Sequence, residues 1–155
     1  MSGDLVRVSI LGMPLAVMQR SSEHSDELLR EFALIRGEGA HHVPARLLAL
    51  IEELRGRFGS FSEGPRRAME AALERGDETI DLHYDVPPTV AAAARQLGDL
   101  LDEADEFCRS GDLLTLATTP EGRAFRHWYL DEFQRQIDGL PPRPWSVVME
   151  AADPG

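Results

Sequence analysis

The side chains best suited to chemistry in this sequence are histidines that lie close to carboxylates. Glu27 follows His24 by three residues, and Asp131 follows His127 by four. On a helix each spacing places both side chains on one face, where they can ligate a transition metal. These residues are therefore candidate metal ligands. The simpler interpretation is surface or helix-capping histidines, because di-metal bundles use Glu-x-x-His pairs, and the helices predicted around His24 and His127 have none.

A second group of candidates is a run of acids that includes the tetrad Asp-Glu-Ala-Asp at residues 102–105. The same letters form the Walker B motif of helicases, which holds Mg²⁺ opposite a phosphate-binding loop with a Lys. The chain has no Lys, so we interpret the match as coincidental. We expect instead an acidic helix stripe, usually a solvated face, that can bind a partner. Its members are Asp99, Asp102, Asp105 and Glu106, and together with Glu103 they are candidate partner-binding residues.

Aromatic residues and Arg meet in one turn near residue 127. Arg126, Trp128 and Tyr129 are typical anchors of protein interfaces, so they are candidate partner-binding residues, although aromatic residues at helical spacing more often form a core. The segment 141–145, Pro-Pro-Arg-Pro-Trp, either docks on a partner or packs back on its own domain, and we favour packing.

Motifs of nucleophilic or cofactor catalysis are missing from the sequence. Cys108 completes an apolar helical seam near a helix C-terminus, where burial and the helix dipole raise a thiol pKa, so we expect an inert thiol. Neither a Gly-x-Ser-x-Gly elbow nor a Gly-rich dinucleotide loop is present. We therefore assign no catalytic residue and no cofactor, and an enzyme is disfavoured.

The elements that must position these side chains follow from hydrophobic periodicity, capping residues and Gly or Pro breaks. The pattern predicts strands over 6–10 and 79–86, and helices over 15–35, 44–58, 62–76, 90–108 and 120–137. Residues 113–117 are ambiguous between a strand and a linker. The predicted fold class is α+β, dominated by about five helices packed with a small sheet of two or three short strands. We expect a single domain over 1–145 and a flexible tail over 146–155.

Composition excludes several classes of function. The 155 residues carry a net charge of −11, and all 16 basic residues are Arg. This balance argues against nucleic acid and anionic membranes as partners. One Cys forms no internal disulfide, and Arg7 and Ser9 interrupt the apolar run 5–18 that would otherwise resemble a signal peptide, so we expect a cytoplasmic protein.

Three stretches carry a family resemblance. They are Glu23–Ile35, Val43–Leu54, and Glu103–Ala117 running into Phe125–Gln136. Together they resemble a protein family of high-GC bacteria, with no assigned activity, whose members are neighbours of anti-sigma-factor kinases and of STAS-domain proteins. The resemblance implies a role in partner switching. Kinases of that type hold Mg²⁺–ATP with an Asn, and this chain has no Asn, so it is not that kinase.

The leading hypothesis is a non-enzymatic regulatory protein that binds a protein partner, an anti-sigma-factor kinase or a STAS-domain protein, in such a pathway. A homo-oligomer is compatible with the sequence. One alternative is a small-molecule sensor with a ligand pocket in the helical core near the small residues Ser22 and Ser25. The other is a metal-dependent DinB-like bundle enzyme that uses the histidine–carboxylate pairs.

Overall fold

The computed structural model describes residues 4–35, 42–110 and 118–152. Its elements are β1 (Val6–Pro14), α1 (Leu15–Ile35), α2 (His42–Phe58), the 3₁₀ turn η2 (Gly59–Ser62), α3 (Glu63–Arg75), β2 (Thr79–Val86), α4 (Val90–Ser110), α5 (Pro120–Ile137) and α6 (Trp145–Ala152). The predicted helix-dominated α+β class is confirmed. The ambiguous segment 113–117 lies outside the described residues, as does most of the loop expected before residue 44.

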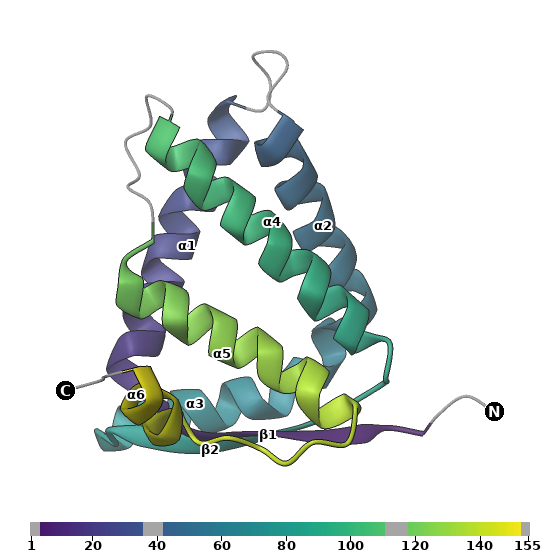
Figure 1. The fold of residues 1–155 in the computed structure, drawn as a ribbon, viewed down its shortest axis with the longest axis vertical. Helices are drawn as coiled ribbons and strands as arrows, with labels where there is room; N and C mark the ends of the chain where they lie inside the picture. Colours follow the sequence, from purple (N-terminus) through teal and green to yellow (C-terminus); the bar gives the residue numbers. More distant parts are fainter. Residues whose placement is uncertain (1–3, 36–41, 111–117, 153–155) are drawn as a thin grey trace.

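The helices α1, α2 and α4 extend away from the sheet, which lies at one end of the molecule beside α3 (Figure 1). Helix α5 runs between these two regions and packs on β1, α1 and α4. This arrangement leaves one face of the α4–α5 pair at the surface of the molecule.

The two strands form an antiparallel sheet whose register runs from Val6 opposite Val86 to Pro14 opposite Thr79. The sequence predicted that β1 ends near Ile10, because Gly12 and Pro14 are strand breakers. The strand instead continues through a bulge between Ile10 and Met13.

The bulge keeps the apolar residues of β1 on one face of the sheet. Ile10 and Met13 are three residues apart and would point to opposite faces of a regular strand, yet both are buried. Gly12 takes a positive φ of 64°, and its backbone N–H donates to Asp81 Oδ1 at 2.7 Å. A left-handed residue with an external acceptor is what this bulge needs, which explains the glycine.

A side chain pairs with the free edge of β1. The Ser9 backbone N–H donates to Gln136 Oε1, and Gln136 Nε2 donates to the Ser9 carbonyl, both at 2.8 Å. The amide of α5 therefore satisfies the two backbone groups that a third strand would otherwise bind.

The helix ends were predicted well, with one exception. Gly76 ends α3 in the left-handed conformation at φ 77°, and Thr119 caps α5 by accepting from the Gly122 backbone N–H at 3.1 Å. Ser62, at the start of the predicted helix 62–76, is of a type that caps helices, but its hydroxyl donates back to the Gly59 carbonyl and makes no cap bond. The Ser62 hydroxyl therefore makes its hydrogen bond within the turn η2, which precedes α3.

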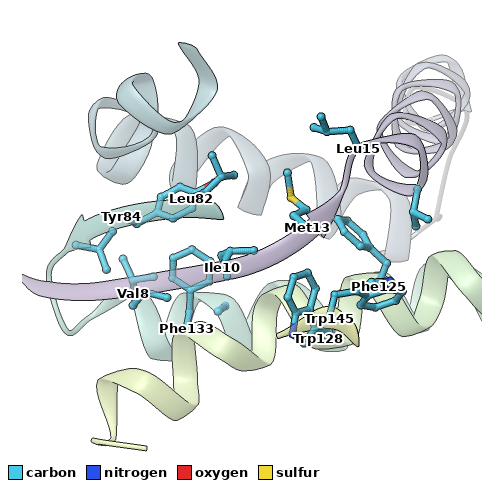
Figure 2. Packing of buried hydrophobic residues seen from close by; sticks show 14 of the residues in the cluster. Val8, Ile10, Met13, Leu15, Leu82, Tyr84, Phe125, Trp128, Phe133 and Trp145 are labelled. Carbon is cyan, nitrogen blue, oxygen red and sulfur yellow. The ribbon is translucent and has the colours of Figure 1, made fainter. Parts of the chain in front are cut away.

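The hydrophobic interior consists of two clusters. The sheet core joins β1 and β2 to α5 and α6, and includes Val8, Ile10, Tyr84, Phe125, Trp128, Phe133 and Trp145 (Figure 2). The helical core joins α1, α2 and α4, and consists of Leu28, Phe32, Leu47, Leu50, Leu100, Ala104 and Cys108. Cluster membership changes at the middle of α4, where Ala94 belongs to the first and Leu100 to the second.

The C-terminal segment differs from the expected tail. We expected a flexible tail over residues 146–155, and the structure has helix α6 over Trp145–Ala152. Trp145 packs against Phe125 and Trp128 at ring-centroid distances of 5.8 and 5.2 Å. The Trp128 indole N–H also donates to the Arg143 carbonyl at 2.8 Å. The preference for packing back on the domain is therefore confirmed.

Candidate functional site

A surface hollow of about 570 Å³ lies between α4 and α5. We call it the α4–α5 groove. Helix α4 contributes Arg95, Asp99 and Asp102, whose spacing places them on one helix face. The polar residues that line the rest of the groove are His127, Asp131, Gln134 and Arg143. Pockets of this size are large enough to take a side chain or a small ligand.

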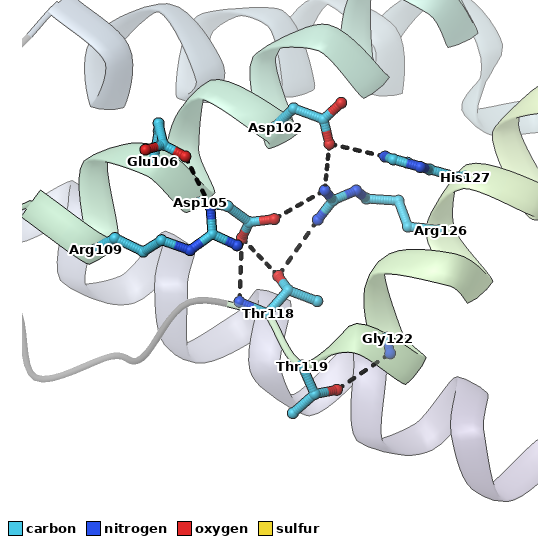
Figure 3. A network of polar contacts seen from close by, with 9 residues as sticks. All are labelled: Asp102, Asp105, Glu106, Arg109, Thr118, Thr119, Gly122, Arg126 and His127. Atoms are coloured by element: carbon cyan, nitrogen blue, oxygen red, sulfur yellow. Dashed lines mark hydrogen bonds and ion pairs between the residues drawn. The ribbon is translucent and has the colours of Figure 1, made fainter.

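Arg126 of α5 contacts two carboxylates of α4, one of them on Asp102, which lines the groove (Figure 3). Its Nη2 lies 2.6 Å from Asp102 Oδ1 and 2.9 Å from Asp105 Oδ2. His127 Nε2 lies 2.9 Å from the same oxygen of Asp102. Asp102 therefore receives contacts from two neighbouring residues of α5, which fixes its carboxylate at the groove wall.

Asp105 lies beneath Asp102 and is 1% exposed. Thr118, just before α5, donates to Asp105 Oδ1 from its hydroxyl at 2.7 Å and from its backbone N–H at 3.2 Å. Burial alone would raise the pKa of Asp105, but the hydrogen bonds from Thr118 and Arg126 outweigh it and lower the pKa below the ordinary value. The same balance lowers the pKa of Asp102, where His127 and Arg126 oppose the effect of burial.

A second buried carboxylate fixes Arg143, which lines the groove. Glu132 of α5 is fully buried, and its Oε2 accepts from Arg143 Nε at 2.8 Å. Its Oε1 accepts from the Arg143 backbone N–H at 2.9 Å and from Gln136 Nε2 at 3.0 Å. Arg143 also contacts Asp131 Oδ2 at 2.8 Å. The segment between α5 and α6 is therefore held against α5 by charge as well as by Trp145.

The outer side of α4 carries three exposed carboxylates, which we call the acidic ridge: Asp99, Glu103 and Glu106. Glu103 pairs with Arg46 of α2 at 3.1 Å, and Glu106 pairs with Arg109 at 2.7 Å, in exposed contacts that carry little stability. Asp99 lines the groove and also a hollow of about 450 Å³ between α2 and α4. Its carboxylate has no ion-pair partner among the described residues.

The structure corrects part of the predicted partner-binding surface. Trp128 is 2% exposed and lies in the sheet core, so only its edge reaches the groove. Tyr129 is half-buried on the core side of α5. Asp105 is buried rather than on the solvated stripe, because Arg126 and Thr118 cover it. Asp99, Glu103 and Glu106 are exposed as expected, whereas the side chains of Asp102 and Arg126 are 36% and 11% exposed within the network.

The candidate metal ligands do not come together. His24 and Glu27 lie on α1, whereas His127 contacts Asp102 and Asp131 contacts Arg143. Among the described residues, no three His, Cys, Asp or Glu side chains are grouped closely enough to hold a metal ion. Asp102 and His127 form a single exposed pair, with side chains 36% and 49% exposed.

Cys108 matches the prediction of a buried thiol. It is 8% exposed in the helical core, and burial, followed by the charges of Asp105 and Glu31, raises its pKa to about 11. The thiol is therefore protonated at neutral pH and is a poor nucleophile.

Sequence reasoning missed three residues that build the groove. Thr118 and Glu132 gave no signal, since a lone Thr before a cap and a Glu on a helix are ordinary. Arg143 carried a weak signal. It lies in the proline-rich segment that was expected to pack back on the domain, and a cation that becomes buried in this way requires an acidic partner.

Comparison of the chain with protein-family models, with curated proteins and with solved structures finds no match. In the described part of the chain, no helix is both long enough and apolar enough to cross a membrane.

Proposed function

We propose that this protein is a regulatory interaction protein that binds a partner protein through the α4–α5 groove and the acidic ridge. The observation that carries the proposal is the groove itself, a hollow of about 570 Å³ with charged walls on two helices. The motif-free sequence supports a binding role over a catalytic one.

The groove is suited to binding because its walls are already ordered. Asp102 is held by Arg126 and His127, and Arg143 is held by Glu132 and Asp131. Binding to fixed side chains loses less conformational entropy than binding to mobile ones. A partner can therefore use these groups without first arranging them.

The charge of the surface indicates the chemistry of the partner. The acidic ridge borders the groove, and the whole chain carries a net charge of −11. Such a surface attracts a basic segment and raises its association rate, and the attraction weakens as salt is added. We therefore expect the partner to present Arg or Lys side chains to Asp99 and Glu103.

The family resemblance of the sequence supports a narrower version of the proposal. It implies an anti-sigma-factor kinase or a STAS-domain protein as the partner, in a partner-switching pathway of the cytoplasm. Those two proteins are the first to test, in a binding assay with the purified full chain.

The test compares two charge reversals. Asp99→Arg places a cation at the groove edge, where we expect it to weaken partner binding at least about tenfold. Glu74→Arg makes the same change in charge on the exposed surface of α3, away from the groove, and should leave binding unchanged. Isothermal titration at two salt concentrations measures both. Equal effects of the two variants, or no effect of Asp99→Arg, would exclude this surface.

A further inference from the structure

A second pocket, of about 290 Å³, lies where the sheet core and the helical core meet. Its walls come from α2, η2, β2, α4 and α5, and they are almost entirely apolar. Side chains that line it include Leu54, Phe58, Val90, Leu97, Leu130 and Phe133. The exposed residues Arg55 and Ser62 mark its mouth.

Apart from Arg55 and Ser62, the described residues with polar side chains that line this pocket are two tyrosines. The hydroxyls of Tyr84 and Tyr129 lie 2.7 Å apart, and both residues line the pocket. Burial raises the pKa of Tyr84, although its hydrogen bond to Tyr129 opposes the shift. Burial, then the proximity of Tyr84, raises the pKa of Tyr129 well above 10. Both hydroxyls are therefore neutral O–H groups at physiological pH.

The tyrosine pair has one hydroxyl hydrogen that is not used in the hydrogen bond between the two residues. Each hydroxyl carries one hydrogen, and the bond between the two oxygens uses one of them. Neither hydroxyl has another hydrogen-bond partner among the described residues. The contact between the two hydroxyls is partly buried, and a donor withdrawn from water without an acceptor is unfavourable, so the pair is ready to donate to an acceptor placed in the pocket.

We propose that this pocket binds a small, neutral, mainly apolar molecule that carries one hydrogen-bond acceptor, which takes the unused hydrogen of the Tyr84–Tyr129 pair. The apolar walls disfavour a charged ligand, because Arg55 at the mouth is the single charged side chain among the described residues that line the pocket. The proposal does not depend on partner binding through the α4–α5 groove.

The volume sets the size of the ligand. An apolar cavity of about 150 Å³ holds benzene, so a pocket of about 290 Å³ accommodates a molecule of roughly two fused rings. The site differs from the one expected near Ser22 and Ser25. Ser22 lines an open hollow of about 260 Å³ between α1 and α3, and Ser25 is not part of its lining.

Three probes of matched shape test the proposal on the full chain. 2-Acetylnaphthalene carries a carbonyl acceptor, 2-ethylnaphthalene has no acceptor, and 2-naphthoate is charged. Titration followed by two-dimensional NMR measures the affinity of each. We expect the ketone to bind about fivefold more tightly than the hydrocarbon, which corresponds to one hydrogen bond, and the carboxylate to bind most weakly.

Two variants connect the binding to the pocket. Tyr84→Phe with Tyr129→Phe removes both hydroxyls and should abolish the preference for the ketone while the hydrocarbon still binds. Ala93→Leu adds carbons to a buried lining residue and should block all three probes. Thermal unfolding checks that each variant is folded. If Ala93→Leu does not fold, the double Phe variant still decides the role of the hydroxyls.

Three results would overturn the proposal. The first is that neither naphthalene binds the wild-type protein. The second is equal binding of the ketone and the hydrocarbon, which would remove the tyrosine pair from recognition. The third is tighter binding of 2-naphthoate than of the ketone, which would show that the site binds anions through Arg55 at its mouth.

Discussion

Replacing Arg126 with Met tests the network that joins α4 to α5. The Arg126 side chain is 11% exposed and contacts two carboxylates, one of which, on Asp105, is 1% exposed. Met has a similar length and keeps the apolar part of the side chain. The substitution therefore removes the cation and leaves Asp105 as a buried charge whose remaining bonds come from Thr118.

The size of the effect follows from burial. Removing one partner of a buried ion pair costs about 3–5 kcal/mol. Asp102 is 36% exposed and stays partly hydrated, and Thr118 continues to donate to Asp105, so we expect the lower end, about 3 kcal/mol. For a chain of this length that loss lowers Tm by about 6–12 °C.

The effect should also depend on pH, with a defined sign. The pKa values of Asp102 and Asp105 are lowered in the folded protein from an ordinary value of 3.8. Their contribution to the free energy of unfolding is therefore complete above that value, and it is lost as the pH falls through the lower folded pKa. In the Arg126→Met variant this contribution is smaller from the start. The difference in the free energy of unfolding between wild type and variant should therefore narrow below pH 3.8.

Urea unfolding from pH 7 to pH 3, followed by circular dichroism, measures this gap. Arg20→Met is the control, because Arg20 pairs with Glu121 in a contact where the side chains are 61% and 46% exposed. It should cost less than about 1 kcal/mol at every pH. The reasoning would be refuted if Arg126→Met lowered the free energy of unfolding as little as the control does. It would also be refuted if the difference between wild type and Arg126→Met were the same at pH 7 and pH 3.

Three further predictions concern other parts of the fold. Thr119→Ala removes the cap bond to Gly122 and should cost about 1 kcal/mol, seen as a fall in Tm of about 2–4 °C; an unchanged Tm would contradict it. Trp145→Ala should cost about 3–5 kcal/mol in urea unfolding, because the ring is buried against Trp128, and a loss under about 1 kcal/mol would show that α6 is not part of the core. Burial raises the pKa of Cys108 to about 11, so a disulfide reagent at pH 8 should react far more slowly with the native protein than after unfolding in urea.

Much of the fold could be predicted from local patterns. The alternation over 79–86 marks β2, and the apolar seam of 90–108 marks α4, because each pattern reports which face of an element is buried. The bulge in β1 could not be predicted this way. Gly12 and Pro14 are typical of a strand end, and only pairing with β2 carries the strand past them.

Helix α6 could not be predicted because its stability comes from distant contacts. It has eight residues, too few to be stable alone, and prolines precede it. Trp145 packs on residues of α5, and Arg143 bonds to the buried Glu132. Both contacts are made with α5, and no pattern within residues 145–152 reports them as a helix.

The candidate site was predicted only in part, for a related reason. Periodicity correctly placed Asp99 and Glu106 on the exposed side of α4. It also placed Asp105 there, although α5 brings Arg126 over that carboxylate and Thr118 under it. The angle at which two helices cross decides which polar residues become buried. That angle depends on tertiary packing and cannot be inferred from the periodicity of one helix.

The bond between Gln136 and the backbone of Ser9 has a consequence for self-association. An unpaired strand edge is a template on which another chain can add a strand, and a two-stranded ribbon is especially prone to it. Here a side-chain amide takes both the donor and the acceptor of Ser9, and α5 and α6 cover β1. A second copy would have to break both hydrogen bonds to extend the sheet at Ser9. Strand addition at this edge of the sheet would therefore have to begin with the separation of α5 from β1.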